Sequence, residues 1–481
     1  MVAHTMHESE KPSRKTSQAR LERMIDTIRS EIGNGTYREG DYLPSEKAYA
    51  KEYHLSNKTV RQGLEVLVAE RLIEKIPRVG NKVARLSRSD TVVLKFGCHT
   101  TLFPEAQMKT LIAEFHKRFP GIRVEVSTFP SGMHTYQSVK TKIEQEGIDV
   151  FSMNYNSMDD FRRNGALDEL ETLEPNPAVY PFLTESATFG GELKMQPFVF
   201  SPLILCYNKE HFREKDVMEP DSSWRWNVLF EQASKLASEN ERLGFYFHFP
   251  SSNRWPVFLL QSGISFERDP SGRFASPEQL ADGLRACREL IYLQKRFPLF
   301  LSEKDGDAEE LFFSEKVSMI MTTYLALNHH ERRSEFEYDI APLPYLKNDP
   351  KTLLLMIGLS IRADSAVKES ARKFVDFLVS YEAQLLIRQK TLSIPSVKPA
   401  AEWSGKESLY RPSRFSMYRD IIPTFRPFTA MNMSTSELYR FYREAKLFWS
   451  GLETEEAAVK RLEQLLFEQE EGLFVREGAK V

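Results

Sequence analysis

Several side chains suited to hydrogen bonding with DNA lie on one face of a helix that the sequence predicts after Ser56. The polar residues on this face are Asn57, Lys58, Arg61 and Gln62. The opposite face is apolar and repeats at helical spacing, through Val60, Leu64, Leu67 and Val68. Amide and guanidinium groups hydrogen-bond the edges of base pairs, and ammonium groups pair with phosphates. The pattern indicates a surface that could contact double-stranded DNA.

Two further helices are predicted to position this face. The first repeats apolar residues at helical spacing and ends at the break Gly33-Asn34-Gly35. The second is capped by Ser45 and runs to about Tyr53, and after a short turn Ser56 caps the third. This order is that of a helix-turn-helix, which places its second helix in the major groove.

A basic hairpin is predicted directly after the third helix. Beyond Leu72 the period changes to that of strands, at residues 73–76 and 82–85, around the turn at residues 77–81. Arg78 lies in the turn and Lys82 begins the second strand. Cations at such a tip are suited to phosphates or to the minor groove.

This region resembles the winged-helix domain of GntR-type regulators over about residues 19–86. The matching stretches are Leu43-Pro-Ser-Glu46, Ser56, Thr59-Val-Arg61 and residues 67–80. The resemblance implies a homodimer that reads an inverted repeat in operator DNA. With the polar face and the hairpin it predicts one set of DNA contacts. These residues are Ser45, Lys47, Ser56, Asn57, Lys58, Thr59, Arg61, Arg78, Gly80 and Lys82.

The sequence departs from the GntR pattern at three places. The family usually has Arg where Lys47 and Asn57 stand, and a Gly-x-Gly-Thr wing where Arg78-Val-Gly-Asn81 stands. These departures leave the operator sequence open. A winged helix used only for protein contacts is the alternative interpretation.

The rest of the chain reads as an α/β body. After a polar break, strands at residues 92–96, 122–126 and 149–153 alternate with helices at about 104–119 and up to 145. This β-α-β-α-β order predicts a mainly parallel sheet with helices on both faces. Ligands bind beyond the carboxyl ends of such strands, here residues 97–100 and 153–156.

The body resembles bacterial extracellular solute-binding proteins of the maltose-binding type over about residues 92–474. The motifs are weak singly but occur in family order. They include Ile148-Asp-Val150, Gly165-Ala-Leu-Asp-Glu-Leu170, Leu205-Cys-Tyr-Asn-Lys209, Phe258-Leu-Leu-Gln-Ser-Gly263, Asp339-Ile-Ala-Pro-Leu-Pro344 and Ile394-Pro-Ser396. The resemblance implies two α/β lobes that close on a ligand by a hinge motion.

The predicted fold is therefore multidomain: an N-terminal α/β winged helix-turn-helix and a C-terminal two-lobed, periplasmic-binding-protein-like fold of type II. We expect a flexible tail at residues 1–18, the winged helix at 19–86, a linker at 87–91 and the ligand-sensing domain at 92–481. Lobe one would comprise about residues 92–204 and 358–405. Lobe two would comprise about residues 205–357 and 406–481.

The family's strand tips imply the residues that would hold a ligand. Trp255 and Tyr324 are the candidates for stacking on a sugar ring. The candidates for hydrogen bonding to hydroxyls are His99, Asn154, Asn156, Asn253 and Arg254. The alternative is that the aromatic residues are core and the Asn residues belong to turns.

No metal site or cofactor is predicted. Cys98, Cys206 and Cys287 are far apart in apolar surroundings, which is typical of buried reduced thiols. His329 and His330 are adjacent, so on a helix they would point to different sides, and we expect a solvated surface there.

Composition places the chain among soluble, cytoplasmic proteins. Its 481 residues are too many for a single hydrophobic core, so at least two domains are expected. The net charge is −3, but residues 1–90 contain 17 Lys and Arg against 13 Asp and Glu, which marks the N-terminal part as the candidate contact for a polyanion. Residues 1–20 have no apolar stretch typical of a signal peptide. No run approaches the roughly 18–20 apolar residues of a membrane span.

These features predict a cytoplasmic transcription regulator that represses genes of carbohydrate uptake or catabolism, under the control of a small sugar or oligosaccharide that closes the two lobes. It would not be an enzyme. GntR-type heads also occur on pyridoxal-phosphate enzymes, but no Schiff-base lysine motif or Gly-rich phosphate loop is found. A solute-binding transport receptor is the other alternative, against which the expected lack of an export signal counts.

Overall fold

The computed structural model describes residues 14–33, 36–70, 72–84, 91–129, 136–263, 277–293, 301–329, 336–346, 349–406 and 409–467. Backbone contacts divide the chain into two compact units. The first unit comprises Met1–Phe96, Met108–Ser127 and Ser365–Phe377. The second comprises Gly97–Gln107, Thr128–Asp364 and Leu378–Val481.

The head, residues 14–84 of the first unit, is a helix-turn-helix with a wing, as predicted. Its helices are α1 (Arg14–Gly33), α2 (Glu46–Glu52) and α3 (Asn57–Ala69). Ser45 and Ser56 cap α2 and α3 by accepting hydrogen bonds from backbone N–H groups. The three helices and the wing share one core. Its buried residues include Met24, Ile28, Leu43, Tyr49, Val60, Leu64, Leu67, Ile73 and Val83.

The wing is an antiparallel hairpin with a shorter tip than predicted. Strand β1 (Ile73–Ile76) pairs with β2 (Gly80–Val83), in the register Ile73↔Val83 and Ile76↔Gly80. The second strand therefore begins at Gly80 rather than Lys82, because pairing continues to the end of the turn. Arg85, the predicted end of that strand, lies outside the described residues.

The remainder of the first unit combines two helices with the first residues of two strands. These elements are α5 (Met108–Arg118), α14 (Lys368–Leu378), β3 (Val92–His99) and β4 (Ile122–Phe129). Phe374 packs edge-on against Phe115 and Phe96, with ring centroids 4.9 and 5.3 Å apart. The predicted helix at 104–119 is in fact two helices. Gln107 takes a left-handed conformation (φ 53°) and separates α4 (Leu102–Ala106) from α5.

In the second unit the main sheet is mixed, so the prediction of a mainly parallel sheet is wrong. The strand order is β5 (Val150–Asn154), β12 (Thr352–Ile361), β8 (Gln196–Asn208), β10 (Val317–Thr323) and β9 (Leu243–Tyr246). Strand β12 is antiparallel to β5 and β8, and β8 is antiparallel to β10. Only β9 and β10 pair in parallel among these strands of the described chain. β11 (Tyr338–Pro342) and β13 (Ile394–Pro395) also pair with β8, and β14 (Phe425–Arg426) with β12.

Strand β8 changes partners along its length. Residues 196–202 pair with β12, whereas residues 203–208 pair with β10 and β11. All of its residues are buried. One strand thus serves two parts of the sheet, and the change falls beside the lobe limit predicted at residue 204. The lobe limits themselves stay a prediction.

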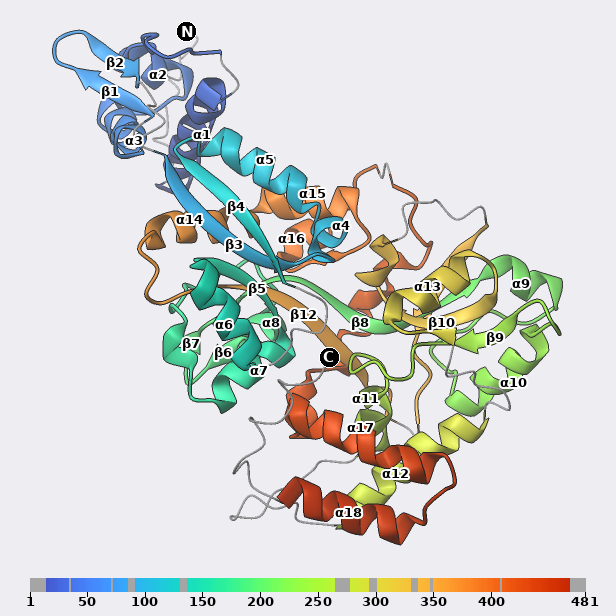
Figure 1. Ribbon diagram of the computed structural model, residues 1–481. Helices are drawn as coiled ribbons and strands as arrows, with labels where there is room; N and C mark the ends of the chain where they lie inside the picture. The colour runs from blue at the N-terminus through green and yellow to red at the C-terminus, as the bar shows by residue number, and fades with distance from the viewer. Residues whose placement is uncertain are drawn as a thin grey trace, which may run out of the picture. The chain divides into compact units, whose positions relative to one another are not determined.

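Helices surround this sheet, and a helical group packs at one side of the second unit (Figure 1). That group consists of α12 (Pro277–Leu293), α17 (Thr435–Trp449) and α18 (Glu455–Phe467). The other helices are α6 (Tyr136–Glu146), α7 (Tyr155–Arg163), α8 (Pro181–Ser186), α9 (Lys209–Glu214), α10 (Trp226–Leu236), α11 (Pro256–Ser262), α13 (Asp305–Phe313), α15 (Tyr381–Lys390) and α16 (Lys398–Ala401). Among the described residues, no helix is both long and apolar enough for a membrane span.

Candidate DNA-contact face and candidate ligand site

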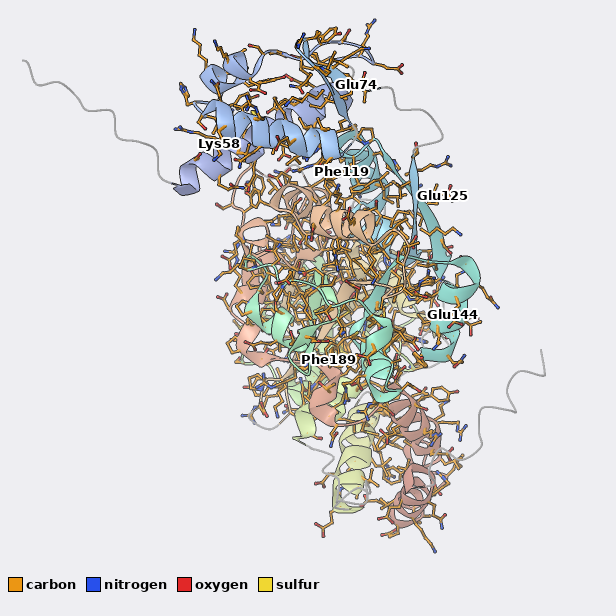
Figure 2. All side chains as sticks on the ribbon, turned by 90° about the vertical axis from the view of Figure 1, so that its left-hand side faces the viewer. Lys58, Glu74, Phe119, Glu125, Glu144 and Phe189 are labelled. Carbon is orange, nitrogen blue, oxygen red and sulfur yellow. The ribbon has the colours of Figure 1, made fainter. Side chains whose placement is uncertain are left out.

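The N-terminal end of α3 presents the predicted polar face to solvent. Asn57, Lys58 and Arg61 are exposed, whereas Val60 and Leu64 are buried against the rest of the head. Lys58 lies on α3, and Glu74 on the wing strand β1 (Figure 2). The helix has the orientation that its apolar repeat requires, so its polar face is available to a partner.

Two of the predicted contact residues already bond within the helix end. Ser56 Oγ accepts a hydrogen bond from Thr59 N at 3.1 Å and lies 2.7 Å from Thr59 Oγ1. Ser45 Oγ accepts one from Ala48 N at 3.2 Å. Their hydroxyls therefore fix the starts of α2 and α3, and a phosphate bound there would meet helix ends that carry positive partial charge.

Arg61 is held in place by a bidentate ion pair across the two helices. Its Nε and Nη2 donate to the Glu46 carboxylate at 3.2 and 2.9 Å. The hydrogen bond from Arg61 lowers the pKa of Glu46, which is therefore ionised at neutral pH. The pair is exposed and contributes little to stability, but it orients the guanidinium along the face of α3.

The wing is placed by backbone bonds to the segment before α2. Leu43 N donates to Asn81 O at 2.9 Å, and Tyr42 forms a bridge with Lys82. At the tip Arg78 is exposed in a left-handed conformation (φ 67°), and Gly80 has φ 143°. Lys82 Nζ lies 3.8 Å from Glu74 Oε1 on the facing strand. The predicted wing residues thus come together on one hairpin, and the exposed Lys47 stands on α2.

Of the predicted ligand residues, three lie at the ends of β3 and β5. Asn154 caps α7, since its Oδ1 accepts a hydrogen bond from Ser157 N at 2.8 Å. Asn156 is half-buried in the first turn of that helix, and His99 packs edge-on against Phe129 with centroids 5.5 Å apart. A ligand role for these three residues stays a prediction.

Trp255 and Tyr324 are both buried in aromatic surroundings. The Trp255 ring stacks on Phe441 and also packs on Tyr442, each with centroids 5.8 Å apart. Tyr324 donates its hydroxyl to Phe415 O at 2.9 Å. These contacts give both residues a packing role, which was the alternative to sugar stacking. Their ligand role stays a prediction.

Arg254 is the predicted ligand residue with the most unusual surroundings. It is 3% exposed, and its Nη2 and Nη1 lie 3.6 Å from Glu309 Oε1 and 3.9 Å from Asp305 Oδ2. Asn253 belongs to the same loop, where its N–H donates to Ser251 Oγ at 3.2 Å and its carbonyl accepts from Arg254. The loop and α13 therefore bring a buried guanidinium and two carboxylates together.

Glu105 and His329 extend this group and were missed by the sequence analysis. His329 Nε2 lies 2.8 Å from Glu105 Oε1, and its side chain is 28% exposed, so the expected solvated surface is wrong at this position. Burial lowers the pKa of His329, but the bond and charge of Glu105 outweigh it, and the pKa is raised overall. His330 lies outside the described residues. We call Glu105, Asp305 and Glu309 the acid cluster.

The sequence pattern did not predict that the carboxylates of the acid cluster are buried. Glu105 lies in a short helix just after a strand tip, and Glu309 lies in the run Ala308-Glu-Glu-Leu-Phe-Phe313, where only its neighbour Glu310 is exposed. The one available signal was a carboxylate at an apolar helical position. Within the described part of the chain, no group of three His, Cys, Asp or Glu could hold a metal ion. Cys98, Cys206 and Cys287 are free and buried, as predicted.

Comparison with known proteins identifies both halves of the chain. Residues 103–385 match the bacterial extracellular solute-binding protein family, and residues 21–83 match the gntR family of bacterial regulatory proteins. The chain therefore belongs to the bacterial extracellular solute-binding protein family and carries a GntR winged helix-turn-helix before that domain. The predicted fold is confirmed.

Curated relatives match about half of this chain. The sn-glycerol-3-phosphate-binding periplasmic protein UgpB of Escherichia coli K12 is 23% identical over 248 residues, which cover 49% of this chain and 55% of that protein. The chain thus spans about half the length of the curated relatives it matches.

Two solved structures share the fold over 78% of this chain. The substrate-binding protein Lmo0181 from Listeria monocytogenes, in complex with cycloalternan, has a TM-score of 0.64 at 19% identity, over 98% of its chain. Maltose-bound MalE3 of T. maritima has a TM-score of 0.65 at 20% identity, over 99% of its chain.

Proposed function

We propose that the chain is a cytoplasmic one-component transcription regulator whose DNA binding is controlled by a small carbohydrate. The observation that carries the proposal is the exposed polar face of α3, in a GntR head that shares a chain with a solute-binding body. The two matched families are a DNA-binding regulator family and a solute-binding protein family, which supports a mechanism of binding and conformational change.

The head would bind DNA as part of a homodimer on an inverted repeat. Asn57, Lys58 and Arg61 would face base edges and nearby phosphates when the start of α3 enters the major groove. Arg78 and Lys82 of the wing would contact the backbone or the minor groove. A two-fold operator is expected because each head reads one half-site.

The body would supply the control. Solved neighbours are described with cycloalternan and maltose, which supports a carbohydrate effector. A ligand that binds a closed form of the two lobes more tightly than an open form shifts the population toward the closed form. We propose that this shift changes operator affinity and relieves repression of genes for carbohydrate uptake or catabolism.

Selection of duplexes from a random DNA library by the full chain tests the proposal. We expect an enriched inverted repeat bound roughly 10³-fold or more tighter than unrelated DNA in fluorescence anisotropy. Lys58→Ala should weaken binding to all sequences and reduce the salt slope by about one, as expected of a phosphate contact. Lys51→Ala, an exposed cation of α2 outside the predicted contacts, is the matched control.

A library that shows no sequence enrichment would contradict the proposal. The curated relatives are periplasmic binding proteins, so a receptor is the second candidate. A chain that binds sugar but ignores every duplex would favour that receptor function.

A further inference from the structure

Three buried carboxylate oxygens of the acid cluster accept no hydrogen bond in the described structure. They are Glu105 Oε2, Asp305 Oδ1 and Glu309 Oε2. Glu105 and Glu309 are only 5% and 1% exposed. A buried acceptor without a donor is costly, and proteins rarely keep one without a reason such as a ligand. Asp305 and Glu309 both lie beside Arg254, and Glu105 is linked to them through His329, which lies within the field of Glu309 and Arg254.

The other oxygen of each carboxylate is already bonded, which fixes the three groups. Glu309 Oε1 accepts from Thr322 Oγ1 at 2.5 Å, and Asp305 Oδ2 accepts from Ser251 Oγ at 2.9 Å. Glu105 Oε1 is held by His329 at 2.8 Å. The unpartnered oxygens are therefore positioned acceptors on anchored side chains, the arrangement that a binding site needs.

The charges around the cluster favour neutral or cationic ligands. Asp305 and Glu309 face Arg254, and Glu105 faces His329. Burial, and the charge of the neighbouring Asp305, raise the pKa of Glu309, so negative charge is already disfavoured at this position. The charges of Glu309 and Arg254 also influence the pKa of His329. The pair His329–Glu105 and the pair Arg254–Glu309 therefore interact electrostatically. An added anion would be repelled at short range in a buried setting, whereas a hydroxyl or ammonium donor would be attracted.

We infer that the acid cluster is an effector subsite that binds hydroxyl or ammonium donors, as in a sugar or an amino sugar, and rejects phosphate esters. The inference rests on the proposed function and names the chemistry of its effector. Asp305 and His329, with side chains 31% and 28% exposed, form the solvent edge of the subsite. This ligand preference would distinguish the chain from UgpB, the relative named for binding sn-glycerol 3-phosphate.

Ligand titrations of the full chain test the inference. The probes are maltose, glucose, glucosamine, sn-glycerol 3-phosphate and inorganic phosphate, followed by thermal shift and calorimetry. We expect at least one sugar or amino sugar to bind, and Glu309→Gln and Glu105→Gln to weaken it at least tenfold. Glucosamine against glucose separates an ammonium from a hydroxyl. Glu310→Gln, on the exposed side of the same helix, should bind like wild type.

The free variants provide a readout that needs no ligand. Gln at position 309 keeps an oxygen for Thr322 Oγ1 and removes a charge that burial disfavours, as the raised pKa of Glu309 indicates. Glu309→Gln should therefore melt at the same or a higher temperature than Glu310→Gln. Binding of sn-glycerol 3-phosphate alone, no binding of any sugar or amino sugar, or wild-type binding by both variants would each overturn the inference. Failure of DNA binding would sink the proposed regulator but leave the subsite intact.

Inside the first unit, the head contacts the end of α5. Arg118 Nη2, at the end of α5, lies 2.7 Å from Asp26 Oδ2 on α1. The guanidinium of Arg29 lies over the Phe119 ring, 5.1 Å from its centroid. Phe119 lies beside the head helices (Figure 2). Arg118 at the end of α5, by a charge pair, and Phe119 directly after it, by a cation–π contact, are thus joined to α1.

The same arginine is joined to the end of α3. Arg29 is 6% exposed, and its Nε and Nη2 donate to the Glu70 carboxylate at 3.0 and 2.8 Å. Glu70 is the C-cap residue of α3. A continuous set of contacts therefore runs from Phe119 through Arg29 to the helix that carries the predicted DNA face. We call Asp26, Arg29, Glu70, Arg118 and Phe119 the Arg29 node.

We propose that the Arg29 node transmits the state of the sensor to α3. Helix α5 begins at Met108, three residues after Glu105 of the acid cluster, and ends at Arg118 of the node. The 11 residues of α5 lie between the two in sequence, and the left-handed Gln107 separates them from Glu105. Coupling of this kind is reciprocal, so DNA bound at the head must also affect α5.

Hydrogen exchange with the selected duplex tests the node without any effector. Binding of the duplex should slow exchange of α5 amides in wild type. Arg118→Gln and Phe119→Ala should bind the duplex within about threefold of wild type, yet lose the change in α5. Lys117→Gln, an exposed neighbour on the same helix, should keep it. An unchanged α5 response in both variants would overturn the proposal, as would no response in wild type.

Discussion

Arg61 is the predicted base contact whose side chain is already held in one orientation, by Glu46. Arg61→Ala should weaken binding to the selected duplex by about 1–3 kcal/mol and relax the preference at one base position, because a bidentate contact to guanine has that value. Anisotropy on single-base variants of the duplex measures both effects. Equal affinity of Arg61→Ala and wild type for every duplex would remove Arg61 from the interface.

His211 makes the stability of the second unit depend on pH. Burial lowers its pKa to about 4, although Glu315 lies 3.6 Å from its Nε2. In the unfolded chain, His211 therefore takes up a proton as pH falls through about 6.5. In the folded chain it stays neutral until a lower pH. Stability is complete above about pH 6.5 and falls as pH drops toward 4, by roughly 2–3 kcal/mol.

Urea unfolding at pH 7 and pH 4.5 measures this loss. His211→Asn, which keeps a polar group beside Ser318, should show a smaller difference between the two pH values than wild type. An identical difference in the variant and in wild type would assign the pH dependence to other groups.

Residue types alone separate binding from packing poorly in this chain. Arg254 was predicted because it follows a strand tip, and the structure places it among carboxylates. Trp255, its neighbour in sequence, fitted the same pattern but packs on Phe441. Glu309 was missed because helical acids are usually solvated. Only the three-dimensional neighbours distinguish a buried acceptor from a surface charge.

Local signals predicted the elements of the head well. Caps at Ser45 and Ser56 and the apolar repeat of α3 are encoded within a few residues, and all were confirmed. The direction of β8 was not predictable, because a fully buried strand is a continuous apolar run in either a parallel or an antiparallel sheet. The break at Gln107 was missed because a non-glycine residue rarely adopts that conformation.

The approach of β9 to α10 provides a test at this scale. A Cβ added at Gly244 would lie 1.8 Å from the carbonyl oxygen of Ala233, a backbone atom that cannot turn away. Gly244→Ala should therefore destabilise the chain by about 3 kcal/mol. Gly121→Ala, where a Cβ would meet nothing within 4 Å, is the matched control and should be neutral. Thermal unfolding measures the melting temperatures of both variants, and Gly244→Ala should melt lower. Equal melting temperatures would contradict this close approach.

At the scale of the whole molecule, sequence predicted the order of the two kinds of domain and their families. It did so because each family carries motifs in a fixed order over a long span. The chemistry of the effector and the route of coupling were not predictable, since a coupling free energy of a few kcal/mol leaves no motif. The acid cluster and the Arg29 node are the structural features that now make both questions testable.

The central claim is that one chain joins sugar binding to DNA binding. Its most direct test is the affinity of the full chain for its selected duplex, measured by anisotropy with and without the sugar or amino sugar that gives the largest thermal shift. We predict a change in Kd of roughly 5- to 150-fold, the usual range of coupling between sites. A saturating ligand that leaves Kd unchanged would contradict the claim.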